Sequence, residues 1–148
     1  MNRPMYETKE DLANERRIQN IIEKRYGCLL RKMPIKLQLD FMAWKDGKAI
    51  GFVEARQRKT PMMKYPTYMI SLHKVLMAQQ LTATTNLPCY LAVQFSDKLA
   101  MCKLPPDDPN NYVDFGGSDR RDDPQDYEPM LYFDMSNFKE VTHDNANT

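Results

Sequence analysis

Residues 35–59 carry the pattern that most constrains how this chain can fold. Apolar and polar residues alternate on both sides of an Asp-Gly pair, as IKLQLDFMAW before it and KAIGFVEARQ after it. An Asp-Gly pair between two alternating runs is typical of a β-hairpin, because these residues accept the backbone angles of a tight turn. The sequence therefore predicts two adjacent antiparallel strands, each with an apolar and a polar face.

The register of this hairpin decides whether Asp40 and Glu54 lie on the same face of the sheet. A slip of one residue moves every side chain of a strand to the opposite face. A two-residue Asp-Gly turn would pair Lys45 with Lys48 and would turn the two carboxylates to opposite faces.

A three-residue loop would pair Trp44 with Lys48 and Asp40 with Phe52 instead. Glu54 would then lie diagonal to Asp40 on the same face, within reach of one shared ion. We favour this loop, because it also places the small and apolar odd-numbered residues of both strands on one side.

Two carboxylates on one face, with a cation beside them, are what a Mg²⁺ site for phosphodiester hydrolysis requires. Asp40 and Glu54 would hold the ion, and Arg56 would stabilise the charge that develops in the transition state. The same residues also fit a hairpin whose outer face simply carries polar groups, because structural ion pairs resemble functional ones. The hairpin alone leaves both interpretations open.

The length of 148 residues predicts one domain with a substantial core. The sequence shows no apolar run long enough to span a bilayer and no basic-then-apolar leader, so we expect no membrane association. The three cysteines, Cys28, Cys89 and Cys102, lack zinc-binding spacing. Their odd number indicates free thiols in a reducing, cytoplasmic compartment.

Charge is distributed unevenly along the chain. Residues 1–74 contain 16 Lys and Arg against 8 Asp and Glu, whereas residues 75–148 contain 5 against 12. A basic half around the candidate site is typical of a phosphate-binding surface. We assign nucleic-acid contacts to five of these basic residues: Arg16, Arg17, Arg58, Lys59 and Lys64.

A first helix is predicted over residues 8–26, from a capping-box pattern to a stop at Gly27. Ile18 and Ile22 define its apolar stripe, and the spacing of Glu15 places that carboxylate on the same face. Glu15 either extends to water at the boundary of the core or has a partner in a site.

A second helix is predicted over residues 66–85, with Pro66 in its first turn. Lys74 lies on the same stripe as Ile70 and Leu81, which is unusual for a lysine. Either its stem packs while its ammonium reaches solvent, or the ammonium reaches the polar face of the sheet.

The remaining segments are predicted from their composition. An arm at 1–6 and a tail at 142–148 flank the domain, and residues 105–129 form an acidic, irregular excursion. The other predicted strands are 28–33, at a sheet edge, 89–95, 99–104 and 130–141.

This order of elements, with Asp and then Glu-x-basic on the hairpin, resembles the PD-(D/E)XK nuclease superfamily over about residues 7–104. The chain is most similar to small phage-encoded and Holliday-junction-resolvase-like members. The resemblance implies an α/β, restriction-endonuclease-like core in the order αβββαβ, with a central mixed β-sheet flanked by two helices. The acidic loop and an extra C-terminal strand are then additions to this core.

The resemblance also implies roles for individual residues. Asp40, Glu54 and the carbonyl of Ala55 match its metal ligands for Mg²⁺ or Mn²⁺, and Arg56 occupies its cation position. Glu15 matches a glutamate that resolvase-like members add from the first helix, and Lys74 or Gln80 matches a second-helix residue. DNA as the substrate, a homodimer, and a phage protein acting in the host cytoplasm follow from the same resemblance.

Two residues depart from the family motif. Leu39 precedes Asp40 where the motif has proline, a common change in divergent members. Arg56 stands where the motif has lysine, and an arginine stays protonated and cannot act as a base. Either Lys74 has taken over the role of the lysine, or the site binds DNA without cutting it.

Three functional hypotheses follow. The first is a Mg²⁺-dependent DNA endonuclease, which requires Asp40 and Glu54 on one face of the sheet. The second is a nuclease-fold protein that binds DNA or protein but is catalytically weak or inactive. The third is a protein-interaction module in which the acidic segment 107–128 mimics DNA or engages a basic partner.

Overall fold

The structure is a computed structural model that describes residues 9–116 and 128–141. The predicted arm, the tail, residue 8 of the capping pattern and residues 117–127 of the excursion lie outside the described residues. In chain order the elements are α1 (Lys9–Tyr26), β1 (Leu29–Lys32), β2 (Phe41–Lys45), β3 (Lys48–Gln57), β4 (Thr67–Ser71), α2 (Leu72–Thr85), β5 (Cys89–Gln94), β6 (Leu99–Lys103), β7 (Tyr112–Gly116), β8 (Glu128–Asp134) and β9 (Lys139–Glu140).

The strands form one large sheet and one small sheet. The large sheet has the order β1-β2-β3-β5-β6-β9, and the small sheet has the order β4-β8-β7. In the large sheet β3 and β5 are parallel and the other pairs are antiparallel. The predicted fold, a mixed sheet with two helices, is therefore confirmed.

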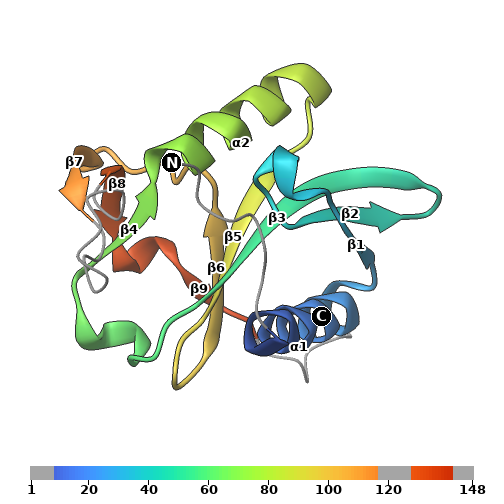
Figure 1. Cartoon of the computed structure of the whole chain (residues 1–148), viewed down its shortest axis with the longest axis horizontal. Coiled ribbons are helices and arrows are strands. Elements are labelled where there is room, and N and C mark those ends of the chain that lie inside the picture. The colour runs from blue at the N-terminus through green and yellow to red at the C-terminus, as the bar shows by residue number, and fades with distance from the viewer. Residues whose placement is uncertain (1–8, 117–127, 142–148) are drawn as a thin grey trace.

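The two helices cover opposite faces of the large sheet (Figure 1). Alternate residues of β3 belong to different core clusters, Phe52 with residues of α2 and Val53 with residues of α1. The small sheet lies beside the start of α2 and shares the core on that side. The middle of the central strand β3, from Gly51 to Ala55, is thus buried between the two core clusters.

The β2–β3 hairpin has a two-residue turn, so the favoured three-residue loop is wrong. Asp46 and Gly47 have φ angles of 53° and 79°, as the tight turn of a two-residue hairpin requires. Lys45 pairs with Lys48 directly across the turn. Had this register continued, the two candidate carboxylates would face apart.

A bulge in β3 restores the expected arrangement of faces. Trp44 pairs with Ala49, but the next pair is Ala43 with Gly51, so Ile50 is an additional residue on the β3 side. This single insertion shifts the register by one residue and reverses the effect of the two-residue turn. The odd-numbered apolar residues of both strands consequently share the α1 face, as predicted.

The last pair of the ladder is Phe41 with Val53, so the same register continued by one residue would place Asp40 opposite Glu54. The expected diagonal relation of the two carboxylates is therefore wrong by two residues of register, although both carboxylates line one cleft. Direct cross-strand neighbours lie closer together than diagonal ones, so this register brings the carboxylates nearer to each other.

The segment before β2 also differs from the prediction. Residues 35–37 form a 3-10 turn (Ile35–Leu37) instead of the start of a strand, and Gln38 adopts a left-handed conformation with φ 67°. Leu39 packs with the α2-side core, away from Phe41. Alternation alone does not reveal such a turn, because a short turn can preserve the apolar pattern.

Both predicted helices are present, with a correction to the second. Helix α1 ends at Tyr26, and Gly27 (φ 63°) donates its N–H to the carbonyl of Glu23. Helix α2 ends at Thr85 as predicted but begins at Leu72 instead of residue 66. Residues 67–71 form strand β4, whose partner β8 lies far away in sequence and is invisible to helical periodicity.

The C-terminal half matches the prediction only in part. The strands predicted at 89–95 and 99–104 correspond to β5 and β6, and β1 lies at the predicted edge. Within the excursion that we expected to be irregular, β7 pairs with β8. The single strand expected over 130–141 is β8, a 3-10 turn and β9. No helix of the described residues is long and apolar enough to cross a membrane.

The bulge at Ile50 can be tested by removing the extra residue. Deleting Ile50 should abolish the cooperative unfolding transition in urea, because it shifts the register by one residue. The hairpin must then either expose its apolar residues to water or turn Asp40 and Glu54 to opposite faces of the sheet. The matched variant Ile50→Ala keeps the residue count, and Ile50 is 36% exposed, so the expected cost is about 1 kcal/mol. A deletion variant as stable as Ile50→Ala would contradict the register described here.

Candidate active site

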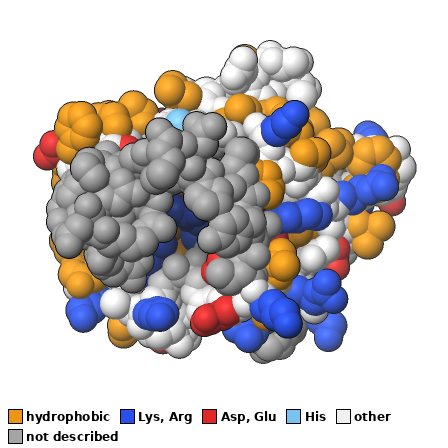
Figure 2. Space-filling view, in the orientation of Figure 1, with side chains coloured by type: hydrophobic (Ala, Val, Ile, Leu, Met, Phe, Trp, Pro, Cys, Tyr) orange, Lys and Arg blue, Asp and Glu red, His pale blue; other side chains and the backbone are white. Residues whose placement is uncertain are grey.

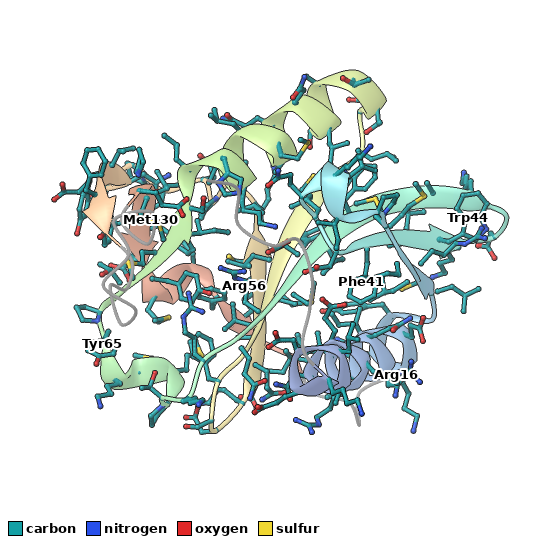
Figure 3. The ribbon with its side chains drawn as sticks, viewed as in Figure 1. Arg16, Phe41, Trp44, Arg56, Tyr65 and Met130 are labelled. Carbon is teal, nitrogen blue, oxygen red and sulfur yellow. The ribbon has the colours of Figure 1, made fainter. Side chains whose placement is uncertain are left out.

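Most of the predicted site residues line one open cleft with a volume of about 440 Å³. Figure 3 shows Arg56 at the middle of the molecule and Arg16 on α1. The cleft brings together seven of the predicted residues: Glu15, Asp40, Glu54, Ala55, Arg56, Arg58 and Lys74. Four other predicted residues are exposed and do not line it: Arg16, Arg17, Lys59 and Lys64.

Asp40 is anchored to the central strand by a main-chain hydrogen bond. The N–H of Ala55 donates to Asp40 Oδ2 at 2.8 Å. Because the ladder ends at Phe41, this bond holds the residue beyond the end of β2 against β3. The Asp40 carboxylate is thereby fixed beside Glu54, and its second oxygen is left for other partners.

Glu54 is a buried carboxylate, only 1% exposed, that faces two cations. Its Oε2 lies 3.3 Å from Lys74 Nζ and 3.6 Å from Arg56 Nη1. Burial and, next, the charge of Asp40 raise the pKa of the Glu54 carboxyl to about 7, and the two cations only partly oppose this. The pair of carboxylates would therefore be stabilised by further positive charge.

Lys74 reaches the polar face of the sheet, which is the second of the two arrangements considered from the sequence. Besides its contact with Glu54, its ammonium donates to the carbonyl of Gln38 in the left-handed turn. The Lys74 side chain is 17% exposed. Two partners from different segments thus hold this ammonium in the cleft.

Glu15 also points into the cleft, and it brings a residue that the sequence analysis missed. Lys32 Nζ lies 2.5 Å from Glu15 Oε1 and 3.5 Å from Asp40 Oδ1. The Glu15 side chain is 13% exposed, so it does not extend to open water. No local pattern singles out Lys32, because its partners come from two other elements.

A second missed residue is Tyr68 on β4, which the sequence analysis placed in a helix. Its ring is buried, and the guanidinium of Arg58 lies 4.6 Å from the ring centroid. Burial raises the pKa of Tyr68 although Arg58 and Arg56 are close enough to oppose the shift. Its hydroxyl lies close to Arg56 and, after Glu54, contributes to the raised pKa of that guanidinium.

The chemistry of these groups fits a hard divalent cation. The described residues contain no cluster of three or more His, Cys, Asp or Glu that could hold a metal ion. Mg²⁺ does not need such a cluster, because proteins often bind it through one or two carboxylates together with water and substrate phosphate. Two adjacent carboxylates that line an open cleft, Asp40 and Glu54, meet this requirement.

A mixed sheet between two helices, with carboxylates and cations on its central strand, is the arrangement expected of the PD-(D/E)XK nucleases. Residues 1–141 match the family model described as "Phage putative PDDEXK endonuclease". The chain therefore belongs to this endonuclease family, and the resemblance inferred from the sequence is confirmed.

A solved structure supports the same fold. The chain is similar to the Holliday junction resolvase Hjc of Archaeoglobus fulgidus, with 11% identity and a TM-score of 0.60. The match covers 95% of this chain and 98% of the resolvase chain. No curated protein sequence matches the chain.

The raised pKa of Glu54 has a consequence for stability without metal. Because the folded protein binds this proton more tightly than the unfolded chain, the free energy of unfolding should fall as pH rises from about 4.5 to about 7. The contribution is about 3 kcal/mol at most. Urea unfolding in EDTA at about pH 5 and about pH 8 should show this fall in wild type and a smaller one in Glu54→Gln. Equal pH dependence in both proteins would contradict it.

The buried hydroxyl of Tyr68 gives a separate prediction. Tyr68→Phe should lower the free energy of unfolding by about 1 kcal/mol, because it removes a buried hydroxyl that faces the charged guanidinium of Arg56. Tyr68→Leu, which also removes the ring under Arg58, should be clearly more destabilising. Unchanged or higher stability of Tyr68→Phe would show that the hydroxyl makes no favourable contact with Arg56.

Proposed function

We propose that this protein is a Mg²⁺- or Mn²⁺-dependent endonuclease that hydrolyses DNA phosphodiester bonds and prefers branched DNA. The observation that carries the proposal is the placement of Asp40 against β3, beside the buried carboxylate of Glu54, in an open cleft. The preference for branched DNA rests on the structural similarity to a Holliday junction resolvase.

The carboxylates of Asp40 and Glu54 and the carbonyl of Ala55 would hold the ion. When bound, such an ion stabilises charge on the phosphate and lowers the pKa of water. The protein contributes a rigid arrangement of ligands: the N–H of Ala55 orients Asp40, and Lys74 with Arg56 orients Glu54. Glu15, from α1, would orient the attacking water or a second ion.

The family motif has a lysine on the central strand, and here Lys74 and Arg56 would together supply its positive charge. Burial disfavours the charge on Arg56, but Glu54 and other neighbours outweigh this and raise its pKa, so the guanidinium stays charged. Arg56 would therefore bind the scissile phosphate and would not accept a proton. Lys74, whose ammonium is 3.3 Å from Glu54, supplies the compact cation.

DNA would lie across the cleft and the basic surface beside it. Figure 2 shows Lys and Arg side chains along the lower side of the molecule, over α1 and the connection between β3 and β4. We assign phosphate contacts to Arg16 and Arg17 on α1, and to Arg58, Lys59 and Lys64 at and beyond the end of β3. Such contacts would make binding strongly dependent on salt.

The proposal includes a homodimer and an intracellular site of action in a phage-infected host. The homodimer rests on the resemblance to resolvases, which act on two strands of a junction. Sedimentation equilibrium with and without a four-way junction would test it.

A second candidate function is DNA binding without cleavage, and Arg56 favours it because an arginine cannot act as a base.

The hypothesis of an acidic interaction segment remains a prediction, since residues 117–127 lie outside the described structure. In the described part of that segment, Asp108 accepts hydrogen bonds from the main-chain N–H of Asp134 and the side chain of Asn137. Asp108 therefore has a structural role within the fold.

Cleavage of labelled four-way junctions and linear duplexes with Mg²⁺ or Mn²⁺ tests the proposal. Asp40→Asn and Glu54→Gln should each reduce the rate by about 100-fold or more, and Lys74→Met by about 10- to 100-fold. Asp46→Asn is a matched control, since it removes a carboxylate from the turn of the same hairpin, where asparagine accepts the positive φ.

The result identifies which candidate function holds. Loss of cutting in the two site variants, with an unchanged Asp46→Asn protein, is the outcome that the proposal requires. Salt-sensitive DNA binding by the wild type, with neither cutting nor metal binding, would replace it with the binding function.

A further inference from the structure

Among the described residues of the cleft, Lys32 is the cation that contacts the carboxylates from the edge of the sheet. It is the last residue of β1 and pairs with Phe41, the first residue of β2. Its ammonium lies 5.5 Å from the centroid of the Phe41 ring and contacts both Glu15 and Asp40. Contacts with α1 and with the start of β2 therefore hold Lys32 at the candidate metal ligands.

The two oxygens of Asp40 have different partners. Oδ2 accepts the main-chain N–H of Ala55, whereas Oδ1 lies 3.5 Å from the ammonium of Lys32. A divalent ion bound to Asp40 through Oδ1 would lie close to this ammonium, and the two positive charges would repel each other strongly in a partly buried site. Lys32 and the ion thus compete for the same carboxylate.

We propose that Lys32 is an internal counter-ion that occupies Asp40 and Glu15 in the metal-free protein and is displaced when a divalent ion binds. This inference rests on the proposed metal site. It goes beyond the family motif, because neither the motif nor the sequence analysis gives a role to a residue of β1.

The exposure of Lys32 makes displacement inexpensive. Its side chain is 40% exposed and stands at the end of an edge strand, so the ammonium can turn to solvent without disturbing the core. The carboxylates that Lys32 would leave, Glu15 and Asp40, are 13% and 19% exposed, and the incoming divalent ion would replace the lost positive charge beside them. Lys74, in contrast, is 17% exposed, holds the buried Glu54 and has a main-chain partner, so we expect it to remain in place.

Calorimetric titration of Mn²⁺ into the metal-free full-length protein, without DNA and at low salt, tests this inference. Lys32→Met should bind Mn²⁺ about tenfold more tightly than wild type, since a competing charge is gone. Lys32→Arg keeps the charge and should remain within about threefold of wild type. Lys36→Met is the matched control, because Lys36 is exposed near the same edge but does not line the cleft, and its affinity should be unchanged.

Thermal unfolding gives a second readout that does not depend on catalysis. Mn²⁺ should raise the Tm of Lys32→Met by more than it raises the Tm of wild type, because tighter binding to the folded state stabilises it further. Should Lys32→Met fail to unfold cooperatively, Lys32→Gln removes the same charge with a smaller change in polarity and serves in its place.

The outcomes separate this inference from the proposed function. Mn²⁺ affinity that is unchanged or weaker in Lys32→Met overturns the counter-ion role. If Asp40→Asn abolishes Mn²⁺ binding in the same experiments, the proposed metal site still stands. A wild-type protein that binds no Mn²⁺ overturns both. Weaker DNA binding by Lys32→Met with unchanged Mn²⁺ affinity would instead make Lys32 an ordinary phosphate contact.

Discussion

The hydrogen bond from the Ala55 N–H to Asp40 Oδ2 is the interaction on which the site depends. It joins a residue outside the β2 ladder to the buried part of β3, the strand to which both core clusters contribute residues. The bulge at Ile50 makes this bond feasible, because it restores the face that the two-residue turn would have reversed. A local irregularity of one residue thus determines whether Asp40 and Glu54 meet at all.

Within the β2–β3 ladder the sequence predicted the faces correctly and the register incorrectly, whereas Leu39, in front of the ladder, packs on the face opposite to the predicted one. Burial of odd-numbered apolar residues requires only that the register be shifted by an even number of residues, and several combinations of turn and bulge satisfy this requirement. Strand β4 was missed because its stability comes from pairing with β8, some sixty residues away. Local periodicity does not reveal such a distant partner. Lys32 reaches the cleft, and Tyr68 reaches the arginine side chains of β3 and its end, through contacts that local sequence patterns also do not reveal.

The arrangement of charged groups in the cleft is compatible with the altered family motif. Each carboxylate has a cation as its neighbour; the groups are Glu15, Lys32, Asp40, Glu54, Lys74 and Arg56. Burial makes ionisation of Glu54 unfavourable even with two cations nearby, so the centre of the site favours additional positive charge. An arginine on β3 is compatible with this chemistry, because a lysine from α2 occupies the position closest to Glu54.

Anomalous diffraction from crystals soaked in Mn²⁺ measures the central claim most directly, since it locates the ion without any assay of activity. The account predicts one strong peak within about 2.5 Å of carboxylate oxygens of both Asp40 and Glu54, with the Lys32 ammonium moved away from Asp40. A peak at another acidic surface, or no peak at a Mn²⁺ concentration well above that needed for cleavage, would contradict it.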